Sequence, residues 1–349
     1  MRNTMSQPGG GRHRDVLVQK ARAYIARGSK SFNAASWLFD RDTRERTWLL
    51  YAWCRRCDDI ADAQDMGGAL GDQSDAAHRV NSIRILTDRA FAGLPTADVA
   101  FDAMGQVASE CGLTREMAED VITGFALDAQ DWRPRTQDDL LRYCYHVAGA
   151  VGVMMARVMM VPASDSATLD RACDLGISFQ LANIARDLVE DDAAGRCYLP
   201  VNWLVREDIE PGQHTKPHHR QELADMAQKL VLLARQYRQS GLAGTRALSF
   251  RQRWAIHAAA RIYGEIAEEV GRRGPLAWHR RVTTSRLQKL RFVGAALIDA
   301  LRKSHPMPDT PPPRSRGEIL VEVRMAGPIA PPPQTPLRDE GIVDRSGGE

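Results

Sequence analysis

The sequence predicts an all-α fold. Only seven of the 18 prolines lie within residues 15–302, and this stretch is rich in Ala, Leu, Arg, Gln and Met. These residues favour helices, whereas proline costs roughly 3 kcal/mol inside a helix. We find no alternating apolar and polar runs bounded by two-residue turns, the pattern that marks β-hairpins. We therefore expect one helical domain over residues 15–302.

Glycine and proline divide this domain into helices of ordinary length. Thr136 precedes an acidic turn and is expected to begin a helix that carries Tyr145. Asp165 is expected to begin the helix that carries residues 183–191 in the same way. Breaks between helices are expected at residues 67–68, 93–95, 134, 162, 195, 211–217, 241–244 and 274–275.

The two ends of the chain differ from this domain in composition. Residues 1–14 are rich in Gly and Arg, and ten prolines lie between Pro306 and Pro336. Such compositions favour disorder or extended polyproline. We expect disordered termini at residues 1–14 and 303–349, in which residues 319–321 have too few apolar neighbours to fold alone.

Charge and cysteine content exclude several classes of protein. The 47 basic and 44 acidic residues nearly balance, which argues against a nucleic-acid coat protein. The longest apolar run, residues 147–156, is well short of the roughly 18 residues that a transmembrane helix needs. The N-terminus lacks the apolar core of a secretory signal, so we expect a cytoplasmic protein with six free thiols. Cys54 and Cys57 are interpreted as two thiols on the apolar side of a helix.

Two segments carry aspartates four residues apart. Asp58 and Asp62 form the first pair, in CRRCDDIAD, and Asp187 and Asp191 form the second, in ARDLVED. Residues four apart share a helix face, so like charges there destabilise the helix unless a cation lies between them. Mg²⁺ takes oxygens from one or two carboxylates and leaves positions for substrate phosphates. Two facing pairs would hold Mg²⁺ and a diphosphate, whereas either pair alone is typical of a solvated acidic face.

Polar neighbours extend the second pair. On a helical wheel Gln180 and Asn183 continue it into a ladder beside the apolar stripe, and Arg186 projects to the far side. In the first segment Asp58 borders the apolar stripe, whereas Asp59 points away. Arginine, whose planar guanidinium group suits diphosphate oxygens, adjoins both segments.

Together with three further motifs, these segments resemble the phytoene/squalene synthase family, and most of all its bacterial phytoene-forming members. The resemblance covers about residues 29–290. It implies a single all-α isoprenoid-synthase domain around a central cavity. The motifs that carry it are SKSF from Ser29, CRRCDDIAD from Cys54, RYCYHVAG from Arg142, QLANIARDLVED from Gln180 and GRCYLP from Gly195.

The resemblance also implies functions for individual residues. The implied metal ligands are Asp58, Asp62, Asn183, Asp187 and Asp191. The implied substrate-binding residues are Lys30, Arg55, Gln180, Asn183, Arg196, Tyr198 and Tyr263. Tyr145 is implied to act in catalysis with the four aspartates, although His146, which stands where some relatives have tyrosine or glycine, leaves open which of the two assists proton transfer. Gly28 replaces a histidine of some relatives, so that diphosphate contact is missing.

The implied reaction is the head-to-head condensation of two geranylgeranyl diphosphates to 15-cis-phytoene through prephytoene diphosphate, the first committed step of carotenoid biosynthesis. It would use Mg²⁺ or Mn²⁺ and no NADPH. One alternative is a squalene or dehydrosqualene synthase acting on farnesyl diphosphate. Another is a non-catalytic family member that acts as an assembly factor, against which the intact aspartates argue. Lipid substrates also make peripheral membrane contact an expectation, whereas no nucleic-acid partner is expected.

Overall fold

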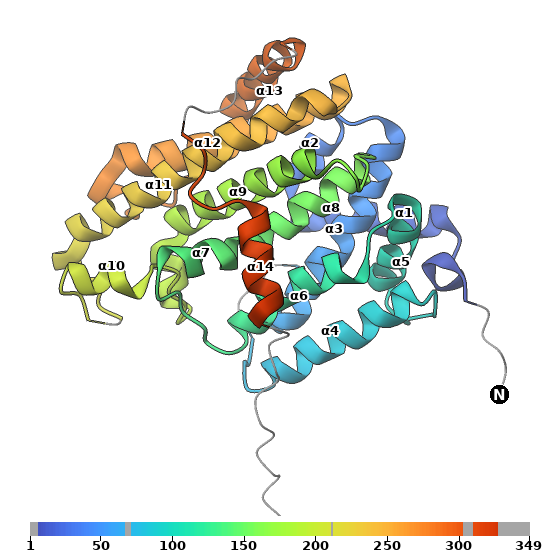
Figure 1. Ribbon diagram of the computed structural model, residues 1–349, viewed down its shortest axis with the longest axis horizontal. Helices are drawn as coiled ribbons and strands as arrows, with labels where there is room; N and C mark the ends of the chain where they lie inside the picture. The colour runs from blue at the N-terminus through green and yellow to red at the C-terminus, as the bar shows by residue number, and fades with distance from the viewer. Residues whose placement is uncertain (1–5, 67–70, 211, 303–309, 327–349) are drawn as a thin grey trace, which may run out of the picture.

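The structure, a computed structural model, confirms the all-α prediction. Every regular element is helical, and no strand occurs in the part of the chain that the structure describes (Figure 1). This part consists of residues 6–66, 71–210, 212–302 and 310–326, with all side chains except those of Lys30, Ser31 and Ala326.

The helices follow one another through short connections. The α-helices of the described residues are α1 (Arg14–Gly28), α2 (Lys30–Ser36), α3 (Arg41–Ala61), α4 (Ala76–Phe91), α5 (Val99–Cys111), α6 (Arg115–Asp128), α7 (Gln137–Cys144), α8 (Ala150–Val158), α9 (Ser166–Ala193), α10 (Val201–Arg206), α11 (Arg220–Ala243), α12 (Phe250–Arg273), α13 (Arg286–Leu301) and α14 (Arg316–Ala326). Short 3-10 turns lie at Pro8–Gly11, Pro217–His219, Gly244–Ala247 and Gly274–Leu276.

Helix α9 runs through the middle of the domain and packs against α8, α11 and α12 (Figure 1). Two glycines allow α8 and α9 to approach closely. A Cβ atom on Gly152 would lie 2.3 Å from the carbonyl oxygen of Ala172, and one on Gly176 would lie 2.3 Å from that of Ala148. A side chain at either position would therefore push the two helices apart. Their close contact holds α9 in place against the helices that enclose the site.

The sequence predicted the starts of two important helices correctly. Thr136 and Asp139 form a reciprocal capping box at the start of α7. The carboxylate of Asp165 accepts from the backbone N–H of Thr168 at the start of α9. The expected breaks at residues 93–95, 134, 162, 195 and 274–275 all fall between α-helices, as does the described part of 211–217. The break expected at 241–244 comes too early, because α11 continues to Ala243. The break expected at 67–68 lies outside the described residues.

A π-helical turn, η2 (Tyr145–Gly149), joins α7 to α8 and was not predicted. The backbone N–H of Ala150 donates to the carbonyl of Tyr145, five residues earlier instead of four. Such turns shift the direction of the side chains that follow, and they are frequent at functional sites. Tyr143, Val147 and Val151, before, within and after the turn, all line the cavity described below.

Short parts of both terminal segments form helix where disorder was predicted. Near the N-terminus, residues 8–11 form a 3-10 turn, and Arg12 Nε lies 2.7 Å from Oδ2 of the buried Asp102. Within the expected tail, α14 packs on α9 and buries Ile319. The domain surface supplies the apolar neighbours that the tail itself lacks. Residues 1–5, 303–309 and 327–349 lie outside the described residues.

The cysteines have the packing role that was expected. All six are free thiols, and Cys57 is fully buried in α3. Burial raises the pKa of the half-buried Cys54 to about 12, so this thiol stays protonated at neutral pH. Across the described residues, no helix combines the length and the apolar character that crossing a bilayer requires.

Candidate active site

A polar cavity of about 630 Å³ lies between the C-terminal turns of α3 and the second half of α9, with α6 and α7 supplying further walls. Its charged and amide-bearing lining residues are Arg55, Asp58, Asp128, Gln180, Asn183, Arg186, Asp187, Asp191 and Arg196. The structure therefore brings together residues from both aspartate segments. Asp128 and Arg186 are the two in this set that were not predicted as site residues.

The first aspartate pair lies at the C-terminal end of α3. Asp58 lines the cavity, and burial, together with the nearby carboxylate of Asp62, raises its pKa to about 6. Helix α3 ends at Ala61, so Asp62 is the residue that caps the helix, where the prediction had placed it inside. Asp59 is buried away from the cavity, and its Oδ1 accepts from Arg55 Nη2 at 2.5 Å.

The second pair forms the predicted polar ladder. Gln180, Asn183, Asp187 and Asp191 lie on one side of α9 and all line the cavity. Burial raises the pKa of Asp191 to about 7, with a further rise from the carboxylate of Asp187. A carboxylate with such a pKa is poorly compensated by its surroundings, which is the condition that an added cation would relieve.

Arginines contact the aspartates of both segments. Arg196 Nη2 lies 2.5 Å from Asp62 Oδ1, and Asp187 is held by Arg186 at 2.5 Å (Nη2 to Oδ2) and by Arg281 at 2.8 Å (Nη2 to Oδ1). The prediction that Arg186 projects to the far side of the helix is wrong, because its long side chain bends back along α9 to the adjacent Asp187. Arg281 comes from the loop before α13, and no spacing rule could have linked it to the site.

Asp128, at the end of α6, is a site residue that sequence reasoning missed. It accepts hydrogen bonds from the hydroxyls of Tyr198 at 2.9 Å (Oδ1) and Tyr143 at 3.0 Å (Oδ2). The two tyrosine rings stack with their centroids 4.7 Å apart. Burial raises the pKa of Asp128 to about 6, although the two hydroxyls and Arg196 act in the opposite direction.

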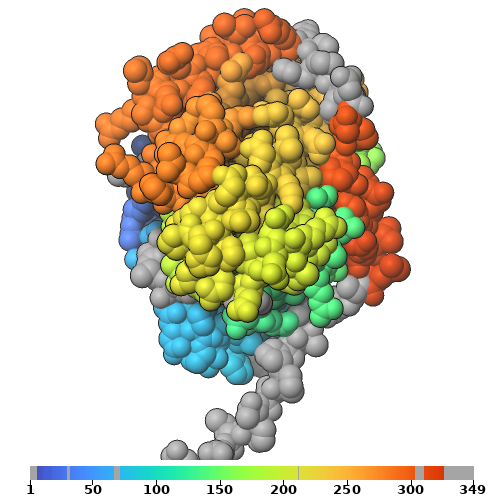
Figure 2. All heavy atoms as spheres, turned by 90° about the vertical axis from the view of Figure 1, so that its left-hand side faces the viewer, coloured from blue at the N-terminus to red at the C-terminus, as the bar shows by residue number. Residues whose placement is uncertain are grey.

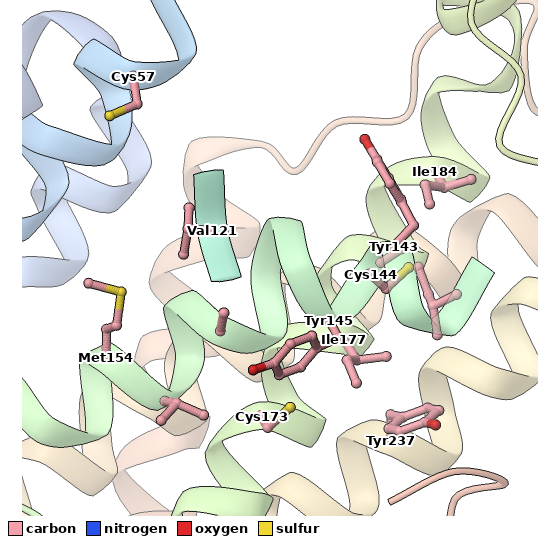
Figure 3. Packing of buried hydrophobic residues seen from close by; sticks show 14 of the residues in the cluster. Cys57, Val121, Tyr143, Cys144, Tyr145, Met154, Cys173, Ile177, Ile184 and Tyr237 are labelled. Atoms are coloured by element: carbon pink, nitrogen blue, oxygen red, sulfur yellow. The ribbon is translucent and has the colours of Figure 1, made fainter. Parts of the chain in front are cut away.

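Tyr145, which is implied to act in catalysis, is not among the residues that line the two cavities. Its ring is buried, and its hydroxyl donates to Asp120 Oδ2 at 2.5 Å. His146 is also buried there, with its Nδ1 2.8 Å from the carbonyl oxygen of Asp120, and burial lowers its pKa to about 4. Figure 3 shows Tyr143 and Tyr145 pointing in different directions from the same helical segment. Tyr143 is therefore the tyrosine of this motif that faces the site.

An apolar cavity of about 330 Å³ adjoins the polar one. Val147, Val151, Gln180 and Asn183 line both cavities, so the two lie side by side. Tyr263, predicted to bind substrate, lies in the apolar wall with its ring stacked on Phe179 at a centroid distance of 4.3 Å. The remaining walls are mostly aliphatic, with Phe32 from α2 and Phe39 from the turn between α2 and α3.

Of two further residues predicted to bind substrate, the structure places the side chain of only one, Tyr198. Tyr198 lies in the polar cavity, where it is held by Asp128. The side chain of Lys30 lies outside the described ones, so its predicted contact with diphosphate stays a prediction. Gly28, the position of a missing histidine, lies at the end of α1 beside Tyr51, with the Tyr51 hydroxyl 2.5 Å from where a Cβ would be.

The donor set fits a hard cation that arrives with a phosphate-bearing ligand. Among the described residues, no group of three carboxylate, histidine or cysteine side chains could hold a metal ion by itself. Mg²⁺ is usually bound by one or two carboxylates together with water and substrate phosphates. Carboxylates with raised pKa values from two helices, with arginines beside them, meet that requirement.

Residues 25–288 match the squalene/phytoene synthase family. The chain belongs to this family. Among its relatives, the 15-cis-phytoene synthase of Pantoea ananas is 42% identical over 298 residues, which cover 84% of this chain and 96% of the relative. The phytoene synthase of Pseudescherichia vulneris is 45% identical over 300 residues, covering 85% and 94%.

Solved structures of the squalene/phytoene synthase family share the fold. A dehydrosqualene synthase in complex with a ligand has a TM-score of 0.71 at 24% identity, covering 81% of this chain and 96% of that protein. A squalene synthase from Alicyclobacillus acidocaldarius has a TM-score of 0.66 at 21% identity, covering 77% and 98%. The expected isoprenoid-synthase architecture is confirmed.

Proposed function

We propose that the chain is a phytoene synthase, a prenyltransferase that joins two molecules of geranylgeranyl diphosphate head to head. The observation that carries the proposal is that a charged cavity adjoins an apolar one and shares four lining residues with it. A prenyl diphosphate has the same division into a charged head and a hydrocarbon tail. The names of relatives that are 42% and 45% identical favour phytoene formation among the reactions of the family.

Mg²⁺, or Mn²⁺ in its place, is the proposed cofactor. The residues that would hold it with the substrate phosphates are Asp58, Asp62, Asn183, Asp187 and Asp191. When bound, the metal supplies positive charge that stabilises the departing diphosphate. NADPH has no part in the proposal, because phytoene formation consumes no reductant.

Arginines would bind the diphosphate beside the metal. Arg55 and Arg196 line the cavity, and their planar guanidinium groups suit phosphate oxygens. Lys30 is proposed for the same role from its motif. Arg281 would add a further cation, since it lies against Asp187. Charges that are in place before the reaction need little reorganisation during it.

The proposed reaction has two ionisations. In the first, the C–O bond of one geranylgeranyl diphosphate breaks and diphosphate leaves with the electron pair. The allylic cation is attacked by a double bond of the second molecule, and loss of a proton closes the cyclopropane ring of prephytoene diphosphate. In the second, this diphosphate leaves, the ring rearranges, and loss of another proton gives phytoene.

The apolar cavity would protect the cations from water. Its stacked aromatic pair, Phe179 and Tyr263, can stabilise positive charge through the ring faces. At the polar end, Asp128 holds the hydroxyls of Tyr143 and Tyr198 toward the cavity. Because its pKa is near 6, Asp128 is suited to hold a released proton.

The test is a product analysis. Purified protein with Mg²⁺ is given geranylgeranyl or farnesyl diphosphate, with and without NADPH, and the extracted hydrocarbon is identified. A C40 phytoene from geranylgeranyl diphosphate without NADPH is expected. A C30 product from farnesyl diphosphate alone would replace the proposal by squalene or dehydrosqualene synthesis. No hydrocarbon from either substrate would favour a non-catalytic assembly factor.

The proposed substrates and product also suggest where the protein acts. Geranylgeranyl chains and phytoene partition into membranes, so we propose a cytoplasmic enzyme that contacts the bilayer peripherally. Fractionation of cells into cytosol and membranes, with and without a high-salt wash, tests this part.

A further inference from the structure

Helix α13 carries an apolar stripe on the surface of the protein. Leu287, Leu290, Ile298 and Leu301 are between 57% and 69% exposed. At 3.6 residues per turn the four fall within an arc of about 80°. The opposite face of the helix, at Ala296, is fully buried against α12. A surface helix usually has the reverse arrangement, with its polar face outward.

The outward orientation of the stripe is held by specific bonds. Trp254 Nε1 on α12 donates to the carbonyl oxygen of Val293 at 2.8 Å, and Arg261 Nε pairs with Asp299 Oδ2 at 2.6 Å. Ser285 and Gln288 form a capping box at the start of α13. Asp299 is the one acidic residue between positions 286 and 301, and its pairing turns it toward α12.

Basic side chains border the stripe on both sides. Arg286 lies at one margin, and Arg291 and Arg302 lie at the other, all three exposed. An apolar face with basic margins is typical of helices that lie in the plane of a bilayer. The long side chains of arginine reach from the apolar zone to the lipid phosphates. The charge of this surface thus complements anionic lipid headgroups.

The stripe lies one helix away from the apolar cavity. Ile256 and Tyr263 of α12 line that cavity, whereas Trp254 and Arg261 of the same helix hold α13. In Figure 1 α13 forms the top of the molecule, far from α4 and α10, and Figure 2 shows the orange C-terminal helices forming the same edge. A bilayer on this edge would meet the protein close to where a hydrocarbon chain is proposed to bind.

We propose that α13 is the surface by which the protein lies on a bilayer containing anionic lipids. The stripe enters the boundary between headgroups and acyl chains, and Arg286, Arg291 and Arg302 contact lipid phosphates. The benefit of membrane binding rests on the proposed function, because the long hydrocarbon substrates and product of that reaction are held in membranes. Binding itself is measured without substrate, so the two proposals can fail separately.

The test is sedimentation of the full chain with vesicles. Vesicles of phosphatidylcholine alone are compared with vesicles of equal parts phosphatidylcholine and phosphatidylglycerol. We expect stronger binding to the anionic vesicles and a decrease with added salt. Leu287→Glu/Leu290→Glu is expected to reduce the partition coefficient at least about tenfold, since it removes two apolar side chains from the stripe. The matched control is Ile85→Glu/Val205→Glu, which changes two exposed apolar residues on α4 and α10.

Three outcomes would decide against the proposal. Equal binding by the stripe variant and the control would overturn it, as would the absence of binding to anionic vesicles. A concentration-dependent dimer in analytical ultracentrifugation that the stripe variant abolishes would assign the stripe to a second copy of the chain. Phytoene formation from detergent-dispersed substrate, which should be equal in variant and control, reports separately on the proposed function.

Discussion

Arg196, which lines the polar cavity, donates to Asp62 Oδ1 at 2.5 Å, although the two residues are 134 positions apart in the sequence. Asp62 caps the end of α3, and Arg196 follows the end of α9, so this bond joins the two helices that carry the aspartate pairs. The walls of the site are therefore tied together at the point where a diphosphate is proposed to bind.

Replacing Arg196 should impair the reaction far more than it impairs folding. Arg196→Ala removes a cation from the proposed diphosphate site and leaves Asp62 without this partner. We expect turnover to fall by about a hundredfold or more, as for loss of one preorganised charge. Arg196→Lys should restore only part of it, because lysine lacks the planar fork. Steady-state kinetics measure the effect, and Arg206→Ala, an exposed arginine on α10, is the control. Equal rates for Arg196→Ala and the control would refute the assignment.

The aspartates of both pairs should be indispensable. Asp58→Asn and Asp187→Asn each remove a carboxylate proposed to hold Mg²⁺, and each is expected to lower turnover by about a hundredfold or more. Circular dichroism should show unchanged helicity. Asp65→Asn is the matched control, because Asp65 is 83% exposed near the same end of α3. Retained activity in either variant would exclude that aspartate as a metal ligand.

The contribution of Asp191 to the stability of the metal-free protein should fall as pH rises toward neutrality. Asp191 has a pKa of about 7 in the folded protein and an ordinary value of 3.8, so the folded state binds its proton more tightly than the unfolded state does. Its contribution is therefore favourable at acidic pH and is lost as pH rises from about 4 to about 7. Asp58 and Asp128 act in the same direction.

Asp191→Asn removes the destabilising effect of the charged Asp191 carboxylate at neutral and higher pH. At about pH 8 the variant is expected to be more stable than the natural chain by about 2 kcal/mol, while its activity is lost. The difference should disappear near pH 4 and shrink when Mg²⁺ and diphosphate are added together. Denaturant unfolding at several pH values measures it. A variant that is equally stable at all of them would contradict the raised pKa.

Tyr143 and Tyr145 should respond differently to loss of the hydroxyl. Tyr143→Phe removes a hydroxyl that faces the cavity and bonds Asp128, so turnover should fall. Tyr145→Phe leaves the half-buried Asp120 without its donor, so it should mainly destabilise the fold, by about 1–3 kcal/mol. Kinetics and thermal unfolding of both variants separate the two effects. The reverse pattern would return the catalytic role to Tyr145.

Helix α14 should contribute to the stability of the domain. A chain that ends at residue 302 loses the buried Ile319, the 2.8 Å bond from the Tyr237 hydroxyl to the carbonyl oxygen of Arg314, and the pair of Arg316 with Asp170. We expect a loss of about 2–4 kcal/mol, most of it from the isoleucine. A chain that ends at residue 326 keeps these contacts and is the control. Equal melting temperatures would show that α14 adds nothing.

The sequence was sufficient to place residues whose positions depend only on the periodicity of one helix. The ladder from Gln180 to Asp191 depends only on the pitch of one uninterrupted helix, so its residues could be placed on one face before any tertiary structure was known. The capping residues Thr136 and Asp165 act within a single turn of chain. The family motifs then indicated that the two aspartate segments face each other.

Residues that depend on packing between elements could not be found in this way. Asp128 joins the site because α6 ends beside α7, and Arg281 joins it because the loop before α13 folds over α9. Neither belongs to a spaced pattern in the sequence. The tail was judged by its own composition, whereas Ile319 is buried against the domain. Tyr143 and Tyr145, two positions apart, point differently, and the choice between them required the structure.

The π turn at residues 145–149 makes this segment sensitive to the number of residues it contains as well as to their identity. It contains one residue more than an α-helical turn, and that residue keeps Tyr143 and Val151 on the same wall of the cavity. A deletion here would restore regular α-helix and rotate everything before it by about 100° relative to α8. Tyr143 would then leave the wall, although every atom of its side chain is still present. Insertions and deletions in this short segment should therefore be selected against more strongly than most substitutions.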